Sequence, residues 1–345
     1  MNKKKLTNSL LNFLCFFLFS SNYAMSQNNA EIFFKSGLSK YYQGDYKGAI
    51  MDYNKAIKLN PNDAVIYFNK GIAQDELSNF QAAILSYNQA IKINSEYKAA
   101  YVNRGLSKYN LGNYKEALID YNKAIMIDPK FAEVYNNRAS VKNELKEYKE
   151  AIQDCNVALQ INPNYAFALT IRGNAKQELG DIQDAILDYN KAIEINPRNA
   201  KTYNNRGLAK GALEDDKGAI LDYDKAIEIN PNFADAFNNR GYSKDKLGDF
   251  KGAILDYNKA TEINPNYAEA YYNRGLAKFK LGDFKGVIID NNKAIEINPN
   301  FAAAYINRGI AKGKLGNREG ACLDWSKAEK LGSKRANDLI KQFCK

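Results

Sequence analysis

Apolar residues recur along the chain with the spacing of one face of a helix, and the whole pattern repeats every 34 residues. One such stretch places apolar residues in the i, i+3, i+4, i+7 order of an amphipathic helix, at Phe250, Ala253, Ile254 and Tyr257. Gly248-Asp249 before this stretch and Asn264-Pro265 after it are typical of helix ends. A second apolar stripe predicts another helix over residues 268–281, so the repeating element is a helical hairpin.

Nine repeats of this hairpin, numbered 1 to 9 in chain order, follow one another in a single frame. They start at Ala30, Ala64, Lys98, Ala132, Ala166, Ala200, Ala234, Ala268 and Ala302, and positions 1 to 34 of each repeat are counted from these residues. One hairpin cannot bury its apolar face alone, so a 34-residue period predicts an all-α solenoid.

Small residues occupy three positions of the repeat. Position 8 is glycine in every repeat except repeat 4, which has Ala139, and position 20 is alanine in every repeat except repeat 8, which has Val287. Position 27 is alanine throughout. We therefore expect the helix backbones to approach one another closely at these points.

These features together resemble the tetratricopeptide repeat family, over residues 30–335. The shared features are an aromatic residue at position 4, Gly at 8, Ala at 20, an aromatic at 24, Ala at 27 and Pro at 32. The resemblance implies a right-handed superhelix, with a concave groove that is lined by the first helix of each hairpin and holds other polypeptides. We expect the repeat array to span residues 27–335, with a capping helix in 336–345 that starts near Lys334.

Two positions depart from the family's usual residues. Position 7, usually leucine, is arginine in seven repeats, and position 23, often aromatic, is aspartate in every repeat except repeat 2, which has Ser86. Antiparallel packing of the two helices would bring positions 7 and 23 together, so the sequence predicts structural ion pairs such as Arg240 with Asp256. The alternative is a track of arginines that binds acidic ligands.

The first 26 residues have the pattern of a secretory signal peptide. Lys3, Lys4 and Lys5 precede the apolar run from Leu10 to Phe19, and a small-residue site ends at Ser26. The run is shorter than the roughly 20 residues that span a bilayer. We expect cleavage after Ser26, no transmembrane segment in the mature chain, and a protein that is exported and is periplasmic, envelope-associated or secreted.

Composition argues against several classes of function. The formal net charge of +10 would lose three basic and no acidic residues on cleavage, and we expect the lysines at positions 11 and 26 to form a solvated face. The tyrosines lie at packing positions, so nucleic-acid binding is not expected. The chain has no histidine, no metal-ligand cysteine spacing and no phosphate loop. We therefore expect no enzyme activity, no metal and no cofactor.

Position 6, on the face of the first helix expected to line the groove, carries an asparagine in seven repeats: Asn69, Asn103, Asn137, Asn205, Asn239, Asn273 and Asn307. This row resembles the asparagine ladder of the O-linked N-acetylglucosamine transferases, whose amides bind the main chain of an extended peptide. Asparagine is also frequent at positions 25 and 31, which favours a compositional origin instead. Apolar residues such as Tyr272 and Ile306 are expected near one end of the groove.

These features indicate a non-catalytic scaffold that binds segments of other proteins or peptides outside the cytoplasm, for example in an envelope complex. The alternative is a self-associating or purely architectural array. Cys322 and Cys344 lie at equal distances from the turn at Ser333, so an antiparallel hairpin would place them opposite each other. They form either a disulfide, as expected in an oxidising compartment, or two packed thiols.

Overall fold

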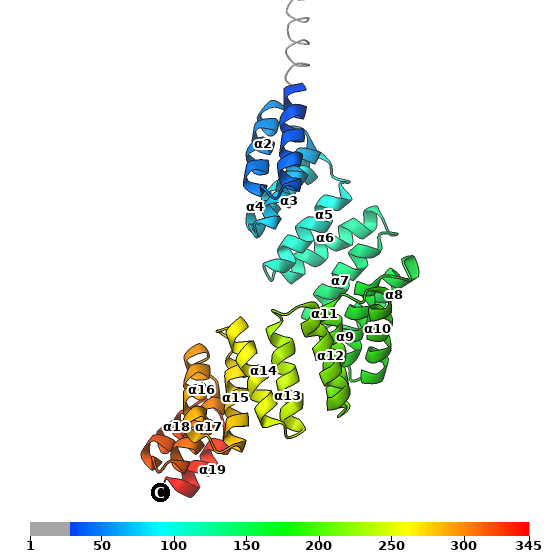
Figure 1. The fold of residues 1–345 in the computed structure, drawn as a ribbon. Helices are drawn as coiled ribbons and strands as arrows, with labels where there is room; N and C mark the ends of the chain where they lie inside the picture. Colours follow the sequence, from blue (N-terminus) through cyan, green and yellow to red (C-terminus); the bar gives the residue numbers. More distant parts are fainter. Residues whose placement is uncertain (1–27, 345) are drawn as a thin grey trace, which may run out of the picture. The chain divides into compact units, whose positions relative to one another are not determined.

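The computed structural model describes residues 28–344, and every regular element in this range is a helix. The all-α class and the paired helices predicted from the sequence are confirmed (Figure 1). The chain divides into two compact units between Pro163 and Asn164. The predicted signal peptide, residues 1–26, lies outside the described residues.

Unit 1 holds repeats 1 to 4. Its helices are residues 28–42, α2 (Tyr46–Leu59), α3 (Ala64–Glu76), α4 (Phe80–Ile93), α5 (Lys98–Asn110), α6 (Tyr114–Ile127), α7 (Ala132–Glu144) and α8 (Tyr148–Ile161). Each hairpin packs its first helix against its own second helix, and α2, α4 and α6 each pack on the first helix of the next repeat.

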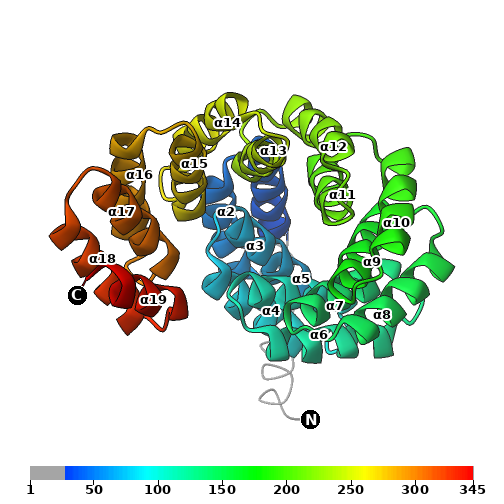
Figure 2. The same ribbon diagram turned by 90° about the horizontal axis from the view of Figure 1, so that it is seen from below.

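Unit 2 holds repeats 5 to 9 and the capping helix. Its helices are α9 (Ala166–Glu178), α10 (Ile182–Ile195), α11 (Ala200–Ala212), α12 (Asp216–Ile229), α13 (Ala234–Lys246), α14 (Phe250–Ile263), α15 (Ala268–Lys280), α16 (Phe284–Ile297), α17 (Ala302–Lys314), α18 (Arg318–Lys330) and α19 (Lys334–Phe343). In this unit the first helices α9, α11, α13, α15 and α17 contact one another in sequence. Within the unit, α12 and α14 lie on the outer side of α11 and α13 (Figure 2).

The turn inside each hairpin contains a residue in the left-handed region, and in six of the repeats a side chain then caps the second helix. In repeat 7, Gly248 has φ +85°, and the Asp249 carboxylate accepts a hydrogen bond of 2.9 Å from the Gly252 backbone N–H. Three repeats place a larger residue at the left-handed position, Ser78, Lys146 and Glu214, with φ between 56° and 63°. These local signals fix where each second helix begins.

The ring at position 24 lies directly on the glycine at position 8, which explains the small residue. A Cβ added at Gly207 would lie 2.6 Å from Cε1 of Tyr223, well inside contact distance. Tyr223 and its equivalents are buried. In repeat 4 both residues differ: the smaller Cys155 replaces the ring, and the larger Ala139 replaces the glycine. Repeat 8 keeps its glycine although Asn291 replaces the ring, and a Cβ added at Gly275 would lie 2.9 Å from the Asn291 Nδ2.

Two glycines of α11 allow this packing to be tested within one helix. We expect Gly207→Ala to destabilise the array by about 1–3 kcal/mol, because the added methyl overpacks against Tyr223. Gly211→Ala should stabilise by up to about 1 kcal/mol, because its Cβ meets only Asp216, at 3.9 Å, and alanine favours the helix. Urea unfolding followed by circular dichroism measures both, and a loss of similar size at the two sites would refute the packing argument.

Helix α19 covers the apolar face of repeat 9. Ser333 caps its first turn by accepting a hydrogen bond from the Ala336 N–H, and the helix begins at Lys334, where the sequence places its start. Leu339 and Ile340 pack on a buried cluster that includes Trp325. Cys322 and Cys344 are joined by a disulfide with Cα atoms 5.8 Å apart, which ties the end of α19 to α18. No helix within residues 28–344 has the length and apolar content to cross a membrane.

Candidate peptide-binding surface

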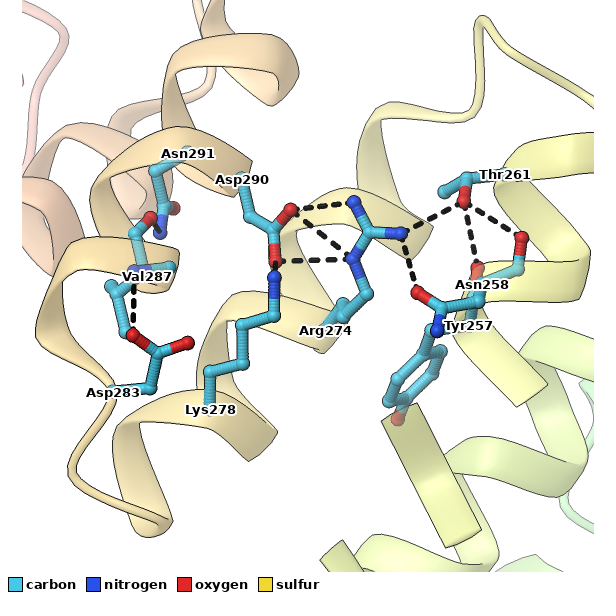
Figure 3. A network of polar contacts seen from close by, with 10 residues as sticks. Tyr257, Asn258, Thr261, Arg274, Lys278, Asp283, Val287, Asp290 and Asn291 are labelled. Atoms are coloured by element: carbon cyan, nitrogen blue, oxygen red, sulfur yellow. Dashed lines mark hydrogen bonds and ion pairs between the residues drawn. The ribbon is translucent and has the colours of Figure 1, made fainter. Parts of the chain in front are cut away.

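The aspartate at position 23 is buried and held by two cations of its own repeat. In repeat 7, Asp256 is 3% exposed and receives hydrogen bonds from Nε and Nη2 of Arg240, at 3.0 and 2.5 Å. Lys244, at position 11, lies 2.8 Å from the same carboxylate. Figure 3 shows the equivalent arrangement in repeat 8, where Arg274 and Lys278 converge on Asp290.

The same arrangement occurs in all seven repeats that carry the arginine. The pairs are Arg104 with Asp120, Arg138 with Asp154, Arg172 with Asp188, Arg206 with Asp222, Arg240 with Asp256, Arg274 with Asp290, and Arg308 with Asp324. In each, the position 11 lysine lies 2.7 to 2.8 Å from the aspartate. The expectation that these lysines form a solvated face is therefore wrong, because the buried carboxylate needs a second donor.

The arginine also links its repeat to the preceding one. Nη1 of Arg240 donates to Asp224, at position 25 of repeat 6, over 2.6 Å. Asn88, Asn122, Asn190, Asn258 and Asn292 accept the corresponding bond from the next repeat. The recurrence of asparagine at position 25 thus has a structural reason. Burial lowers the pKa of Arg240, but the hydrogen bonds and charges of Asp256 and Asp224 outweigh it and raise that pKa overall.

Each of these guanidinium groups except that of Arg172 also lies over the aromatic ring at position 4 of its own repeat. The guanidinium carbon of Arg240 is 5.4 Å from the centre of the Phe237 ring, a cation–π distance. With a carboxylate on one side and a ring on another, the arginines are built into the hairpin. This arrangement fits the structural pair better than a track of arginines offered to acidic ligands.

Repeats 1 and 2 lack the arginine at position 7 and satisfy position 23 with other side chains. In repeat 1, Asp52 is bound by Lys40, Ser36 and Lys55, and the hydrogen bond from Lys40 chiefly lowers the pKa of its carboxyl. That ionised form stabilises the fold, so the contribution is lost as the pH falls below the ordinary carboxyl range.

In repeat 2, where the aspartate is absent, Ser86 donates to Gln74 over 2.7 Å. No hydrogen bond or ion pair joins Lys70 to Ser86, and burial lowers the pKa of Lys70. Repeat 2 thus has lysine in place of arginine at position 7 and serine in place of aspartate at position 23. The ion pair is lost, but no carboxylate is left buried without a partner at position 23.

A double-mutant cycle at positions 7 and 23 tests the pairing. Arg240→Leu should cost about 2 kcal/mol, less than the 3–5 kcal/mol typical of a broken buried pair, because Lys244 still holds Asp256. Adding Asp256→Tyr should recover most of the loss by recreating an apolar contact. Chemical unfolding of the four proteins gives the coupling energy, and strictly additive losses would show that the two residues act independently.

In unit 2 the position 6 asparagines form a hydrogen-bonded row along the first helices, which we call the amide row. The Nδ2 atoms of Asn205, Asn239 and Asn273 donate to Asn174, Asn204 and Asn238 of the preceding repeat, over 2.8, 3.0 and 3.1 Å. Asn204 and Asn238, at position 5, are buried, whereas the three members of the row remain partly exposed. Sequence reasoning did not foresee these bonds between repeats.

In unit 1 the position 6 amides are not joined in this way. Asn69 donates to the Val65 carbonyl of its own helix over 2.8 Å, and Asn137 accepts from Asn136 over 3.4 Å. The Asn103 amide makes no hydrogen bond with the described residues and is half-buried. The continuous row therefore belongs to unit 2.

Two of the predicted groove residues are buried. Ile306 is 5% exposed and packs in the cluster that α19 covers, and Asn307 is 9% exposed. Their assignment to an open groove is corrected accordingly. Tyr272 is half-buried, with its ring centre 4.9 Å from that of Phe301.

Two exposed side chains border the amide row, and the repeat pattern alone did not single them out. Leu208 and Tyr242 lie at position 9, three residues after the asparagines of repeats 6 and 7, on the same helix face. Asp245, one helical turn after Tyr242, has a buried Oδ1 without a hydrogen-bond partner among the described residues, and burial raises the pKa of its carboxyl. The surface thus combines amides, apolar side chains and one carboxylate.

Within residues 28–344, the antiparallel helical hairpins of each unit pack in chain order, an arrangement that defines a helical-repeat protein. Family models described as tetratricopeptide repeat match residues 64–97, 99–131, 132–165, 200–233, 222–254 and 268–301, and a model described as TPR repeat matches 37–78, 173–214 and 246–282. The chain belongs to the tetratricopeptide repeat family. No protein of curated function matches it in sequence.

Solved structures show the same fold. A tetratricopeptide repeat protein from Parabacteroides merdae is 22% identical, with a TM-score of 0.62 over 73% of this chain and 99% of its own. A chain of the APC/C hetero-tetramer Cut9–Hcn1 is 17% identical, with a TM-score of 0.64 over 80% of this chain and 54% of its own. These likenesses concern the fold alone.

Proposed function

We propose that this protein is a non-catalytic scaffold that binds extended segments of partner proteins along the amide row of unit 2. The observation that carries the proposal is the set of three hydrogen bonds between side-chain amides of consecutive repeats. These bonds hold Asn205, Asn239 and Asn273 at a regular interval on one face.

A carboxamide suits the recognition of a peptide main chain. It offers two N–H donors and one oxygen acceptor, and the bond to the preceding repeat uses one donor. Within the described residues, the Oδ1 atoms of Asn205 and Asn273 accept no hydrogen bond, so they can bind peptide N–H groups. Leu208 and Tyr242 would contact side chains of the bound segment.

The buried ion pairs support this role by fixing neighbouring repeats relative to each other. Arg206 and Arg240 bind position 25 of the repeat before them, so the first helices of repeats 5 to 7 are joined at defined distances. A surface held in place in this way orders a flexible peptide without first having to order itself.

We place this scaffold outside the cytoplasm, with an envelope complex as one setting. The support is the pattern of residues 1–26 and the disulfide between Cys322 and Cys344, which suits an oxidising compartment. Separating the exported from the retained fraction of cells that express the full chain tests the location directly.

Replacing the row tests the proposed peptide site. We expect Asn205→Ala, Asn239→Ala and Asn273→Ala, combined, to weaken the binding of a peptide selected from a random display library by about tenfold or more, since several hydrogen bonds of about 1 kcal/mol are lost. Fluorescence anisotropy gives the dissociation constants. The matched control is Asn232→Ala, Asn266→Ala and Asn300→Ala, which removes three exposed asparagines of the same period from the inter-repeat turns.

Changes in the peptide test whether the amide row binds its main chain. N-methylation of its backbone should weaken binding to the parent protein, whereas exchange of side chains away from Leu208 and Tyr242 should change it little. Circular dichroism must show equal helicity for all proteins, because the triple variant also loses bonds between repeats. Equal affinity of the row variant and the control would refute the amide row as the binding site.

A second candidate, a self-associating or architectural array, is favoured by a different observation. Position 22 of the outer helices carries an exposed apolar residue in every repeat except repeat 4, which has Gln153. In unit 2 these residues are Leu187, Leu221, Leu255, Ile289 and Leu323, each 63 to 68% exposed. A periodic apolar row of this kind often marks an interface.

Light scattering after size exclusion separates the two candidates. If the outer row drives self-association, the parent chain should run as an oligomer, and Leu221→Gln, Leu255→Gln and Ile289→Gln together should convert it to a monomer. Lysines lie four residues before and after Leu221 and Leu255, so two copies would place like charges together, and we expect a monomer. An oligomer that the glutamine variant abolishes would favour the second candidate.

A further inference from the structure

A cavity of about 580 Å³ lies between the last hairpin and the capping helix. Its apolar lining includes Ile310, Trp325, Leu339 and Phe343, and the cations Lys314 and Arg318 also line it. This volume is within the range of small-molecule sites in proteins, about 300–1,000 Å³. The amide row and its apolar neighbours do not contribute to this cavity.

The cavity arises from a local change in the repeat. In repeats 1, 3 and 8, aromatic rings at positions 12 and 17 pack against each other inside the hairpin: Tyr41 with Tyr46, Tyr109 with Tyr114, and Phe279 with Phe284, with ring centres 5.3 to 5.5 Å apart. Repeat 9 has Gly313 and Arg318 at these positions. Both rings are also missing in repeats 5 and 6, but repeat 9 alone has a cation at position 17 and lies under the capping helix.

The space around Gly313 is large enough for a side chain. A Cβ placed there would meet only the Ala321 methyl, at 3.9 Å, so a side chain could be accommodated. The covering element is also shorter than elsewhere, because α19 has 10 residues whereas the first helices have 13. Its end is fixed over the cavity by the Cys322–Cys344 disulfide and by a hydrogen bond of 2.5 Å from Arg318 Nε to the Phe343 carbonyl.

We infer that this cavity binds a small amphipathic carboxylate, with its apolar body along the lining formed by Ile310, Leu339 and the edge of Trp325, and its carboxylate at Lys314. The two aromatic rings and the aliphatic side chains suit an alkyl or aromatic group. Lys314 is exposed and forms no ion pair with the described residues, so it can bind the acid group. The positive charge of Arg318 also favours an anion at this end.

Trp325 provides an internal reporter, because it is the only tryptophan of the chain and lies in the cavity wall. Titration of the oxidised full-length protein with decanoate should change tryptophan emission saturably. Decan-1-ol and decylamine should bind at least about tenfold more weakly, since a charge-assisted hydrogen bond is worth about that factor.

Two variants and their matched controls locate the site. Gly313→Phe restores a ring at position 12 and should abolish the saturable change, whereas Gly211→Phe, at the same position of repeat 6, should leave it intact. Lys314→Gln should remove the preference for the acid over the alcohol, and Lys280→Gln, at the same position of repeat 8, should keep it. Unchanged helicity by circular dichroism shows that each variant is folded.

Three results would overturn the inference: no saturable change with decanoate, equal affinity for the acid and the alcohol, or full binding by the Gly313→Phe variant. Because peptide binding is assigned to repeats 5 to 8 and this cavity to repeat 9, loss of one activity leaves the other measurable. Failure here is therefore distinguishable from failure of the proposed scaffold function.

Discussion

The buried carboxylate at position 23 is the interaction on which the seven repeats that carry the arginine depend, both within the hairpin and at its junction. A carboxylate such as Asp256 can be buried only if donors surround it, and Arg240 and Lys244 supply them. Because the arginine also reaches position 25 of the preceding repeat, the bonds that satisfy one aspartate join two repeats. An apolar contact at the same place would hold the two repeats together. Because it is not directional, it would fix their relative position less strictly than charge-assisted hydrogen bonds do.

This constraint shapes the binding surface. In the seven repeats that carry the arginine, the arginine and the lysine at position 11 both bind the position 23 aspartate, so these cations are committed to the network rather than offered to a partner. What remains partly exposed on the first helices of unit 2 is a row of amides with apolar neighbours at Leu208 and Tyr242. Such a surface favours contacts with the peptide main chain over recognition of a charged sequence.

The end of the array follows a different rule. A terminal repeat must cover its apolar face without a following hairpin, and here α19 does so with Leu339, Ile340 and a disulfide. The shorter cover and the loss of two rings leave a cavity that repeats 1, 3 and 8 fill. The end of the array can therefore carry a site that the regular packing between repeats does not provide.

The sequence by itself determined the hairpins, their frame and the residues that pair, because period, caps and small residues are local or repeat nine times. It also predicted the opposition of Arg240 to Asp256 and of Cys322 to Cys344, since both follow from antiparallel geometry. It could not reveal that the position 11 lysines point inward, or that Asn239 bonds to Asn204, because both depend on side-chain directions across helices. The packing of Ile306 under α19, and the cavity beside Gly313, were decided only by how α19 packs, which no periodicity encodes.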